Sequence, residues 1–275
     1  MSGRAVVFGG GGLVGLAWGI GWLDGLSKAE VSLADADLVV GTSAGAALTA
    51  MVDATDRSRV AQALQLVPAL GTGAAELPEA IALCLAMPDA APATVQAIGR
   101  AALSAATIGE GEWRGLVGML AGQIGRDWAA QAAVTATDAE TGERIVLRAG
   151  DAPLADALAA STAVPGILPV VSVAGRRLMD GGVASITNAD VARDAGAERI
   201  LVVRLVPASA PEGPYANRPA RLVEETAGVA HVLEVAPEDP PEGDLMDPAL
   251  VSPAYTAGYW QGKNGADAVR AFWAA

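Results

Sequence analysis

Short apolar runs alternate along the chain with longer segments of helical character. The runs at 4–8 (RAVVF), 37–40 (DLVV) and 199–206 (RILVVRLV) are typical of buried parallel strands. Residues 13–26 are apolar all round and predict a buried helix, and 46–54 predict the next helix. Strands that alternate with helices predict an α/β fold with three layers, in which helices cover both faces of a mainly parallel central sheet.

Residues 56–130 form an Ala-rich segment that lacks strand signals. We expect several helices there, broken at Pro68, Pro78, Pro88 and Pro92. This helical insertion is expected to act as a cap near a functional site and to shape an apolar pocket, although a plain scaffold role is an equal alternative.

The remaining pattern continues the alternation of strands and helices to the last residues. Because no linker interrupts it, we expect residues 1–275 to form a single domain. The expected elements are two strands around a Thr-Gly turn in 132–147, a helix at 153–161, a hairpin at 170–182 turning near Ala174-Gly175, a helix at 188–196 capped by Asn188, a strand at 230–237, and a closing helix at 254–273 interrupted at Gly262, with loops at 207–220 and 237–244.

Charge and cysteine content narrow the class of protein. The net charge of −13 disfavours nucleic acid as a partner and allows at most peripheral contact with a membrane. The single cysteine, Cys84, indicates a reducing compartment. Residues 5–23 carry no charge, but seven of these nineteen residues are glycine, so a strand, loop and helix are expected rather than a membrane span. We therefore expect a cytoplasmic protein.

The loop after the first strand matches G-x-G-x-x-G from Gly10 to Gly15. A dinucleotide site would also need an acidic residue at the end of the second strand, but that strand ends in Gly41. Consecutive glycines before a helix favour an oxyanion site instead, because their N–H groups can turn inward without side chains in the way. A tight turn without a ligand is the third alternative.

A second motif, GTSAG at 41–45, places Ser43 between a strand and a helix, where a nucleophilic serine is raised on a sharp turn. A serine that only caps the helix is the alternative. The only histidine, His231, lies inside an expected strand and is a poor candidate for the base. Asp180 is better placed, because it ends a strand before Gly181 and Gly182, although a turn-forming aspartate has the same appearance.

Four motifs in order resemble the patatin-like phospholipase family, and the resemblance covers nearly the whole chain. They are GGGLVG at 10–15, GTSAG at 41–45, ASTAVP at 160–165 and DGG at 180–182. One position departs from the family pattern, since Val14 stands where the family often has Arg or Lys. That difference weakens the expectation of a phospholipid and leaves a neutral lipid, a short acyl ester or another acyl donor as an equal alternative.

The resemblance implies a Ser–Asp dyad that cleaves acyl-lipid esters without a metal or cofactor. It implies Ser43 as the nucleophile, Asp180 as the base, and an oxyanion hole formed by Gly11 and Gly12 together with Gly10. Gly41, Gly45, Gly181 and Gly182 would support the two turns. We expect a serine acyl-ester hydrolase; the alternatives are an oxidoreductase that binds a nucleotide through the glycine loop, and a relative that binds lipid without catalysis.

Overall fold

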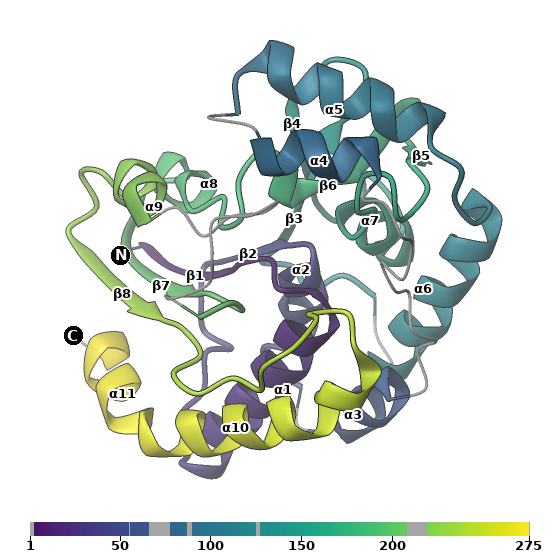
Figure 1. The fold of residues 1–275 in the computed structure, drawn as a ribbon. Helices are drawn as coiled ribbons and strands as arrows, with labels where there is room; N and C mark the ends of the chain where they lie inside the picture. The colour runs from purple at the N-terminus through teal and green to yellow at the C-terminus, as the bar shows by residue number, and fades with distance from the viewer. Residues whose placement is uncertain are drawn as a thin grey trace.

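The computed structural model describes residues 3–54, 56–65, 78–86, 90–124, 127–207 and 219–274. Its strands join into one sheet in the order β5-β6-β3-β2-β1-β7-β8, and β4 pairs with β3 beside this path (Figure 1). The strands are β1 (Gly3–Phe8), β2 (Leu38–Thr42), β3 (Ala132–Asp138), β4 (Arg144–Leu147), β5 (Val171–Val173), β6 (Arg176–Asp180), β7 (Ala197–Val203) and β8 (His231–Val235).

The middle of the sheet is parallel, as the sequence predicts. The strands β3, β2, β1, β7 and β8 run in one direction, whereas β4 and β6 are antiparallel to β3, and β5 is antiparallel to β6. The carboxyl ends of the parallel strands therefore meet at one edge of the sheet, where ligands bind in α/β folds. The hairpin of β5 and β6 turns at Ala174-Gly175, as expected, and both residues adopt positive φ.

Helices cover both faces of the sheet. They are α1 (Gly12–Lys28), α2 (Ala44–Thr49), α3 (Ser58–Leu64), α4 (Glu79–Ala86), α5 (Pro92–Ser104), α6 (Glu110–Ile124), α7 (Leu154–Ser161), α8 (Asp190–Asp194), α9 (Pro219–Glu225), α10 (Val251–Asn264) and α11 (Ala266–Ala274), with short 3-10 helices at Gly181–Val183 and Pro248–Leu250. This three-layer arrangement confirms the predicted fold class (Figure 1).

The alternation of side chains along the strands separates the two cores. Val6 and Phe8 of β1 pack under α1 and α10, whereas Ala5 and Val7 face α8 on the other side. The central strands are buried on both faces, which explains why they read as continuous apolar runs rather than as an alternating pattern.

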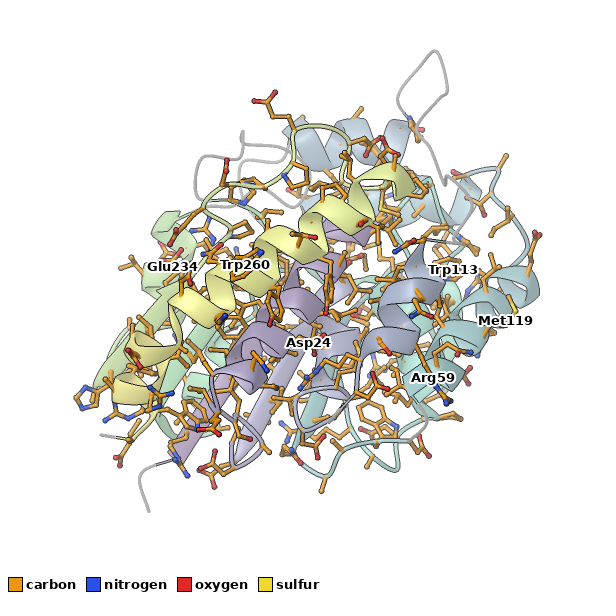
Figure 2. The ribbon with its side chains drawn as sticks, turned by 90° about the horizontal axis from the view of Figure 1, so that it is seen from below. Asp24, Arg59, Trp113, Met119, Glu234 and Trp260 are labelled. Atoms are coloured by element: carbon orange, nitrogen blue, oxygen red, sulfur yellow. The ribbon has the colours of Figure 1, made fainter. Side chains whose placement is uncertain are left out.

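The helices α1 and α10 touch through glycines, with almost no side chain between their backbones. A Cβ at Gly21 would lie 2.1 Å from the Tyr255 carbonyl oxygen, and one at Gly258 would lie 2.1 Å from the Trp18 carbonyl oxygen. Figure 2 shows α10 lying across α1, with Asp24 and Trp260 on the two helices. The hydroxyl of Tyr255 donates to Asp24 at 2.7 Å and adds a polar contact to this pair. The position of α1 is thus set by backbone contact with α10.

The segment 56–130 is helical wherever the structure describes it, with α3, α4, α5 and α6 in place of strands. Pro92 begins α5 and Pro78 immediately precedes α4, whereas Pro68 and Pro88 lie outside the described residues. The four helices do not form one cap. The helices α3 and α6 lie on the α1 side of the sheet, whereas α4 and α5 pack against the other face near Met179.

Two local predictions are wrong, and one short helix was not predicted. Asn188 does not cap α8, because its side chain turns into the protein and the residue at the cap position is Ala189. The closing helix is divided at Gly265 rather than Gly262, because Gly262 is needed for the contact with Trp22. The short helix α9 was not predicted, and most of the expected 207–220 loop lies outside the described residues.

In the described ranges, every helix is too short or too polar to cross a lipid bilayer.

Candidate active site

Ser43 stands on a sharp turn between β2 and α2, at the carboxyl edge of the parallel strands. Its backbone has φ 53° and ψ −122°, a combination that L-residues rarely adopt and that is typical of strained functional positions. The flanking glycines allow the turn to pack closely, since a Cβ at Gly45 would lie 2.3 Å from the Phe8 carbonyl oxygen. The turn therefore presents Ser43 outward from the sheet, as a nucleophile elbow does.

Replacing Gly45 by alanine is expected to lower the free energy of unfolding by about 3 kcal/mol, because the new methyl group meets backbone that cannot move aside. Gly115→Ala on α6 is the matched control, since a Cβ there meets nothing within 4 Å. That control should raise stability by about 0.5–1 kcal/mol, because alanine favours a helix over glycine. Urea unfolding of both variants measures the two effects, and equal stability of Gly45→Ala and the native protein would contradict the expectation.

The side chains of Ser43 and Asp180 lie in direct contact. The Oγ of Ser43 donates to Oδ2 of Asp180 at 2.6 Å, although 137 residues separate them in the sequence. Asp180 is the last residue of β6 and is 1% exposed. Its second oxygen accepts from the Gly182 N–H at 2.7 Å, so both carboxylate oxygens have a donor. This geometry suits proton transfer from the serine to the carboxylate.

Burial controls the protonation of Asp180. Desolvation raises the pKa of this carboxyl from 3.8 to about 7, while the hydrogen bonds from Ser43 and Gly182 act in the opposite direction. An aspartate at its ordinary pKa is a weak base at neutral pH, whereas one near 7 is matched to proton transfer there. Burial therefore brings the pKa of this carboxyl into the range in which an aspartate can exchange a proton at neutral pH.

Cys84 contributes to the same buried region from α4. It is 2% exposed, and burial, with a smaller contribution from the charge of Asp180, raises the pKa of its thiol to about 12. The thiol is therefore neutral, and the residue packs as a small apolar side chain.

Ser161 supports the elbow, a contact that sequence reasoning missed. The last residue of α7, Ser161 is fully buried, and its Oγ accepts a hydrogen bond from the Ser43 backbone N–H at 2.8 Å. This serine belongs to the ASTAVP segment, which was singled out as a motif without a role for any of its residues. The motif itself was the available signal, but only the fold shows which backbone group its hydroxyl meets.

The glycine loop lies beside Ser43 and begins α1. The N–H of Gly10 donates to the Ile186 carbonyl at 2.8 Å, so this group is occupied and the expectation that Gly10 supplies an oxyanion donor is corrected. Within the described part of the chain, the N–H groups of Gly11 and Gly12 have no hydrogen-bond acceptor. They belong to the free amino end of a helix, where the helix dipole favours negative charge.

An apolar cavity of about 300 Å³ opens beside Ser43. Its walls come from α1, α2, α3, α6 and α7, and include Leu16, Leu64, Trp113 and Leu120 together with Gly12 of the loop. The expectation that the Ala-rich segment shapes an apolar pocket therefore holds for α3 and α6 but not for α4 and α5. Met119, labelled on α6 in Figure 2, also lines the cavity and is 63% exposed, so apolar surface continues from the cavity to the solvent.

Two further residues that the sequence analysis considered, His231 and Val14, have structural places in the fold. His231 is the first residue of β8 and pairs with Arg199 at the amino end of β7, the opposite edge of the sheet from Ser43. The N–H of Val14 donates to the Leu245 carbonyl at 2.9 Å, and the Val14 side chain is buried. Across the described ranges, no three His, Cys, Asp or Glu side chains gather in a way that could hold a metal ion.

Comparison with known proteins agrees with this assembly of motifs. A family model described as "Patatin-like phospholipase" matches residues 6–193, which include the glycine loop, the elbow, Ser161 and Asp180. The chain therefore belongs to the patatin-like phospholipase family, whose members are generally lipid acyl hydrolases that act on lipid substrates.

Among solved structures, the chain is similar to VipD from Legionella pneumophila at 13% identity and a TM-score of 0.44, with 98% of this chain and 67% of that chain covered. It is also similar to the type III effector protein ExoU at 16% identity and a TM-score of 0.37, with 97% of this chain and 53% of that chain covered. This chain thus spans about two thirds of the first structure and about half of the second.

Proposed function

We propose that this protein is a serine acyl-ester hydrolase in which Ser43 is the nucleophile and Asp180 the general base. The observation that carries the proposal is the 2.6 Å hydrogen bond from Ser43 Oγ to Asp180, formed between a strained elbow and a buried carboxylate. Membership of a family of lipid acyl hydrolases supports the same reaction class.

The reaction proceeds in two halves. Asp180 accepts the Ser43 proton while Oγ bonds to the acyl carbon, and the carbonyl electrons move to its oxygen. The tetrahedral intermediate then collapses, the alcohol leaves with the proton returned by Asp180, and Ser43 holds the acyl group. In the second half Asp180 takes a proton from water, whose oxygen attacks the acyl carbon, and the carboxylic acid leaves as Ser43 recovers its proton.

The N–H groups of Gly11 and Gly12 are the donors for the oxyanion of both intermediates. They are without acceptors in the described structure, they lie at the start of α1, and Gly12 lines the same cavity as Ser43. Removal of one such donor costs about 3–4 kcal/mol of transition-state stabilisation in comparable enzymes.

The substrate is an uncharged acyl ester with one chain of medium length. The cavity of about 300 Å³ opens at Ser43 and is lined mostly by apolar side chains, so it suits a single acyl chain of medium length. Val14, at a position where the family often carries a cation, and the net charge of −13 both disfavour an anionic headgroup.

A series of p-nitrophenyl esters of increasing chain length tests the substrate assignment. We expect kcat/KM to rise with chain length as long as each added methylene is buried in the cavity, because each contributes about 0.8 kcal/mol, and then to fall. Ala63→Phe fills the cavity from α3 and should lower the preferred length while leaving hydrolysis of the acetyl ester unchanged. A flat chain-length profile in the native protein would exclude the cavity as the acyl site.

The activity is expected to rise with pH and to reach half its maximum near pH 7. The free enzyme needs Asp180 ionised to accept the serine proton, and burial raises the pKa of this carboxyl to about 7. Protonation below that value therefore removes the base. The pH dependence of kcat/KM for a soluble ester, measured between about pH 5 and pH 9, checks this expectation. A half-maximum near the ordinary pKa of aspartate would show that Asp180 is not the titrating group.

Labelling with a fluorophosphonate tests the function as a whole. We expect stoichiometric labelling of the Ser43 peptide, identified by mass spectrometry, and loss of ester turnover in the labelled protein. A folded protein that neither reacts nor hydrolyses esters would refute the proposal. In that case binding of fatty acid or of NAD(P) separates the two alternatives, a lipid-binding relative and a nucleotide-binding protein.

A further inference from the structure

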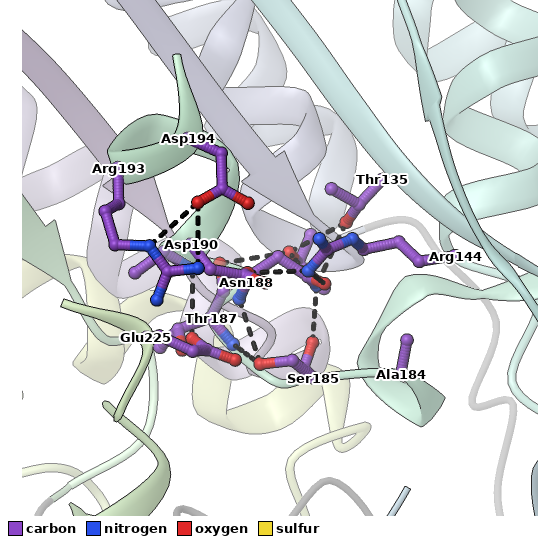
Figure 3. Close-up of polar contacts among 12 residues, drawn as sticks. Thr135, Arg144, Ala184, Ser185, Thr187, Asn188, Asp190, Arg193, Asp194 and Glu225 are labelled. Atoms are coloured by element: carbon purple, nitrogen blue, oxygen red, sulfur yellow. Dashed lines mark hydrogen bonds and ion pairs between the residues drawn. The ribbon is translucent and has the colours of Figure 1, made fainter. Parts of the chain in front are cut away.

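A buried polar cluster lies beneath the elbow, between β2, β3 and the segment that follows β6. It is centred on Asn188 and includes Thr42, Thr135 and Ser185, all of them at most 3% exposed. Figure 3 shows Asn188 pointing into this cluster, with contacts on several sides. Buried polar groups are costly unless they are paired, so the arrangement of partners around Asn188 is restrictive.

The side-chain nitrogen of Asn188 contacts four acceptors. It lies 2.6 Å from the Ser185 carbonyl oxygen, 3.0 Å from Thr42 Oγ1, 3.2 Å from Thr135 Oγ1 and 3.4 Å from the Gly181 carbonyl oxygen. The two hydroxyls are also bonded to each other at 2.9 Å. A single amide group therefore joins two strands and a turn.

Two of these four partners are the covalent neighbours of the proposed catalytic residues. Thr42 directly precedes Ser43, and Gly181 directly follows Asp180. Thr135 lies between them on β3 and also donates to the Gly41 carbonyl at 3.3 Å. The amide of Asn188 thus links the side chain of Thr42, which precedes Ser43, to the backbone carbonyl of Gly181, which follows Asp180.

The orientation of this amide is held from outside the cluster. Its oxygen accepts from Nη1 of Arg144 at 3.3 Å, and the same guanidinium pairs with Asp190 at 2.6 Å (Figure 3). The backbone N–H of Asn188 donates to Ser185 Oγ at 3.0 Å. Asn188 also has φ 52°, a left-handed conformation that asparagine tolerates better than most residues. A rotated amide would present its nitrogen to Arg144 and lose both sets of contacts.

We propose that Asn188 is a positioning residue, whose amide holds Ser43 and Asp180 at reacting distance by tying Thr42 to Gly181. The inference rests on the proposed function, because it concerns the geometry of the same pair. It also explains why Asn188 does not cap α8, since its side chain is used under the elbow. A shift of about 1 Å between reacting groups can cost about a hundred-fold in rate.

Two substitutions of Asn188, which disturb the site in different ways, test the proposal. Asn188→Asp keeps the shape, the tolerance of positive φ and the pairing with Arg144, but it replaces the donor with an acceptor. Asn188→Gly keeps the backbone conformation and removes the amide without adding a charge. The control is Thr187→Val, which removes an equally buried hydroxyl from the adjacent residue, where it donates to Glu225 rather than to the elbow.

The readout is kcat per competent site, with competent sites counted by fluorophosphonate titration and folding followed by thermal unfolding. We expect kcat to fall ten- to hundred-fold in both Asn188 variants with KM within about twofold, because the acyl cavity lies on other helices. Thr187→Val is expected to lose stability and keep kcat.

A kcat per competent site that matches the native protein in either folded Asn188 variant would overturn the proposal. A fall no larger than that of Thr187→Val would overturn it as well. An inactive native protein would instead refute the proposed function, so the two failures are distinguishable.

Discussion

Ser43→Ala is expected to lower kcat/KM for an acyl ester by about ten-thousand-fold, the largest effect we expect from any single substitution in this chain. The substitution removes Ser43 Oγ, which donates the hydrogen bond from the elbow to the Asp180 carboxylate. The glycine loop and the cavity stay in place. Residual turnover should reflect the remaining oxyanion donors and the bound ester.

The fold should survive this substitution. Alanine adopts the positive φ of residue 43 at a cost similar to that of serine, so the free energy of unfolding should change by less than about 1 kcal/mol. Ser104→Ala on α5 is the control, because its hydroxyl bonds only within its own helix. Steady-state kinetics and urea unfolding of both variants check the result. Turnover above a tenth of the native value in Ser43→Ala would rule out Ser43 as the nucleophile.

Asp180→Asn is expected to abolish turnover and to stabilise the protein at the same time. Asparagine is isosteric, accepts from the Gly182 N–H as the carboxylate does, and presents an NH₂ group to Ser43 in place of the oxygen. It cannot accept the serine proton, so kcat should fall at least a thousand-fold.

The gain in stability follows from the raised pKa of Asp180. The folded protein holds this carboxyl's proton up to about pH 7, whereas the unfolded chain releases it near 3.8, so stability falls as pH rises through that window and stays lower above it. Asparagine removes this loss, and we expect the variant to be more stable than the native protein by roughly 2–4 kcal/mol at pH 8. Below about pH 4 the two should unfold alike. Equal stability at both pH values would show that the buried carboxylate carries no such cost.

Those elements of the fold that depend on a short stretch of sequence could be predicted. The apolar runs locate β1, β2 and β7, and the glycines mark the turns on which Ser43 and Asp180 stand. Both turns depend on steric freedom at single positions, which is a local property of the chain. The pairing of Ser43 with Asp180 rests on the lack of a suitable histidine, on the place of Asp180 at the end of a strand before two glycines, and on the resemblance to a family.

The contacts that complete the site were not predictable from local patterns. Ser161 meets the Ser43 N–H across 118 residues, and Asn188 meets Thr42 across 146. The neighbouring sequence is the same whether a hydroxyl or amide caps a helix or bonds to a distant strand. The local pattern therefore predicts Asn188 as a cap of the helix that follows it. The Gly10 amide is a similar case, because only the fold brings the Ile186 carbonyl to it.

The backbone contact of α1 with α10 joins the first helix of the chain to one of the last. The helix α1 carries the glycine loop at its amino end, yet its partner surface is contributed by residues such as Tyr255, which follows Asp24 by 231 positions. The matched family region, 6–193, ends before α10 begins. A nascent chain that has exposed Ser43 and Asp180 from the ribosome therefore still has α1 without its glycine-paired partner. We therefore expect the glycine loop at the amino end of α1 to be held in place only once α10 has been synthesised and has packed against α1.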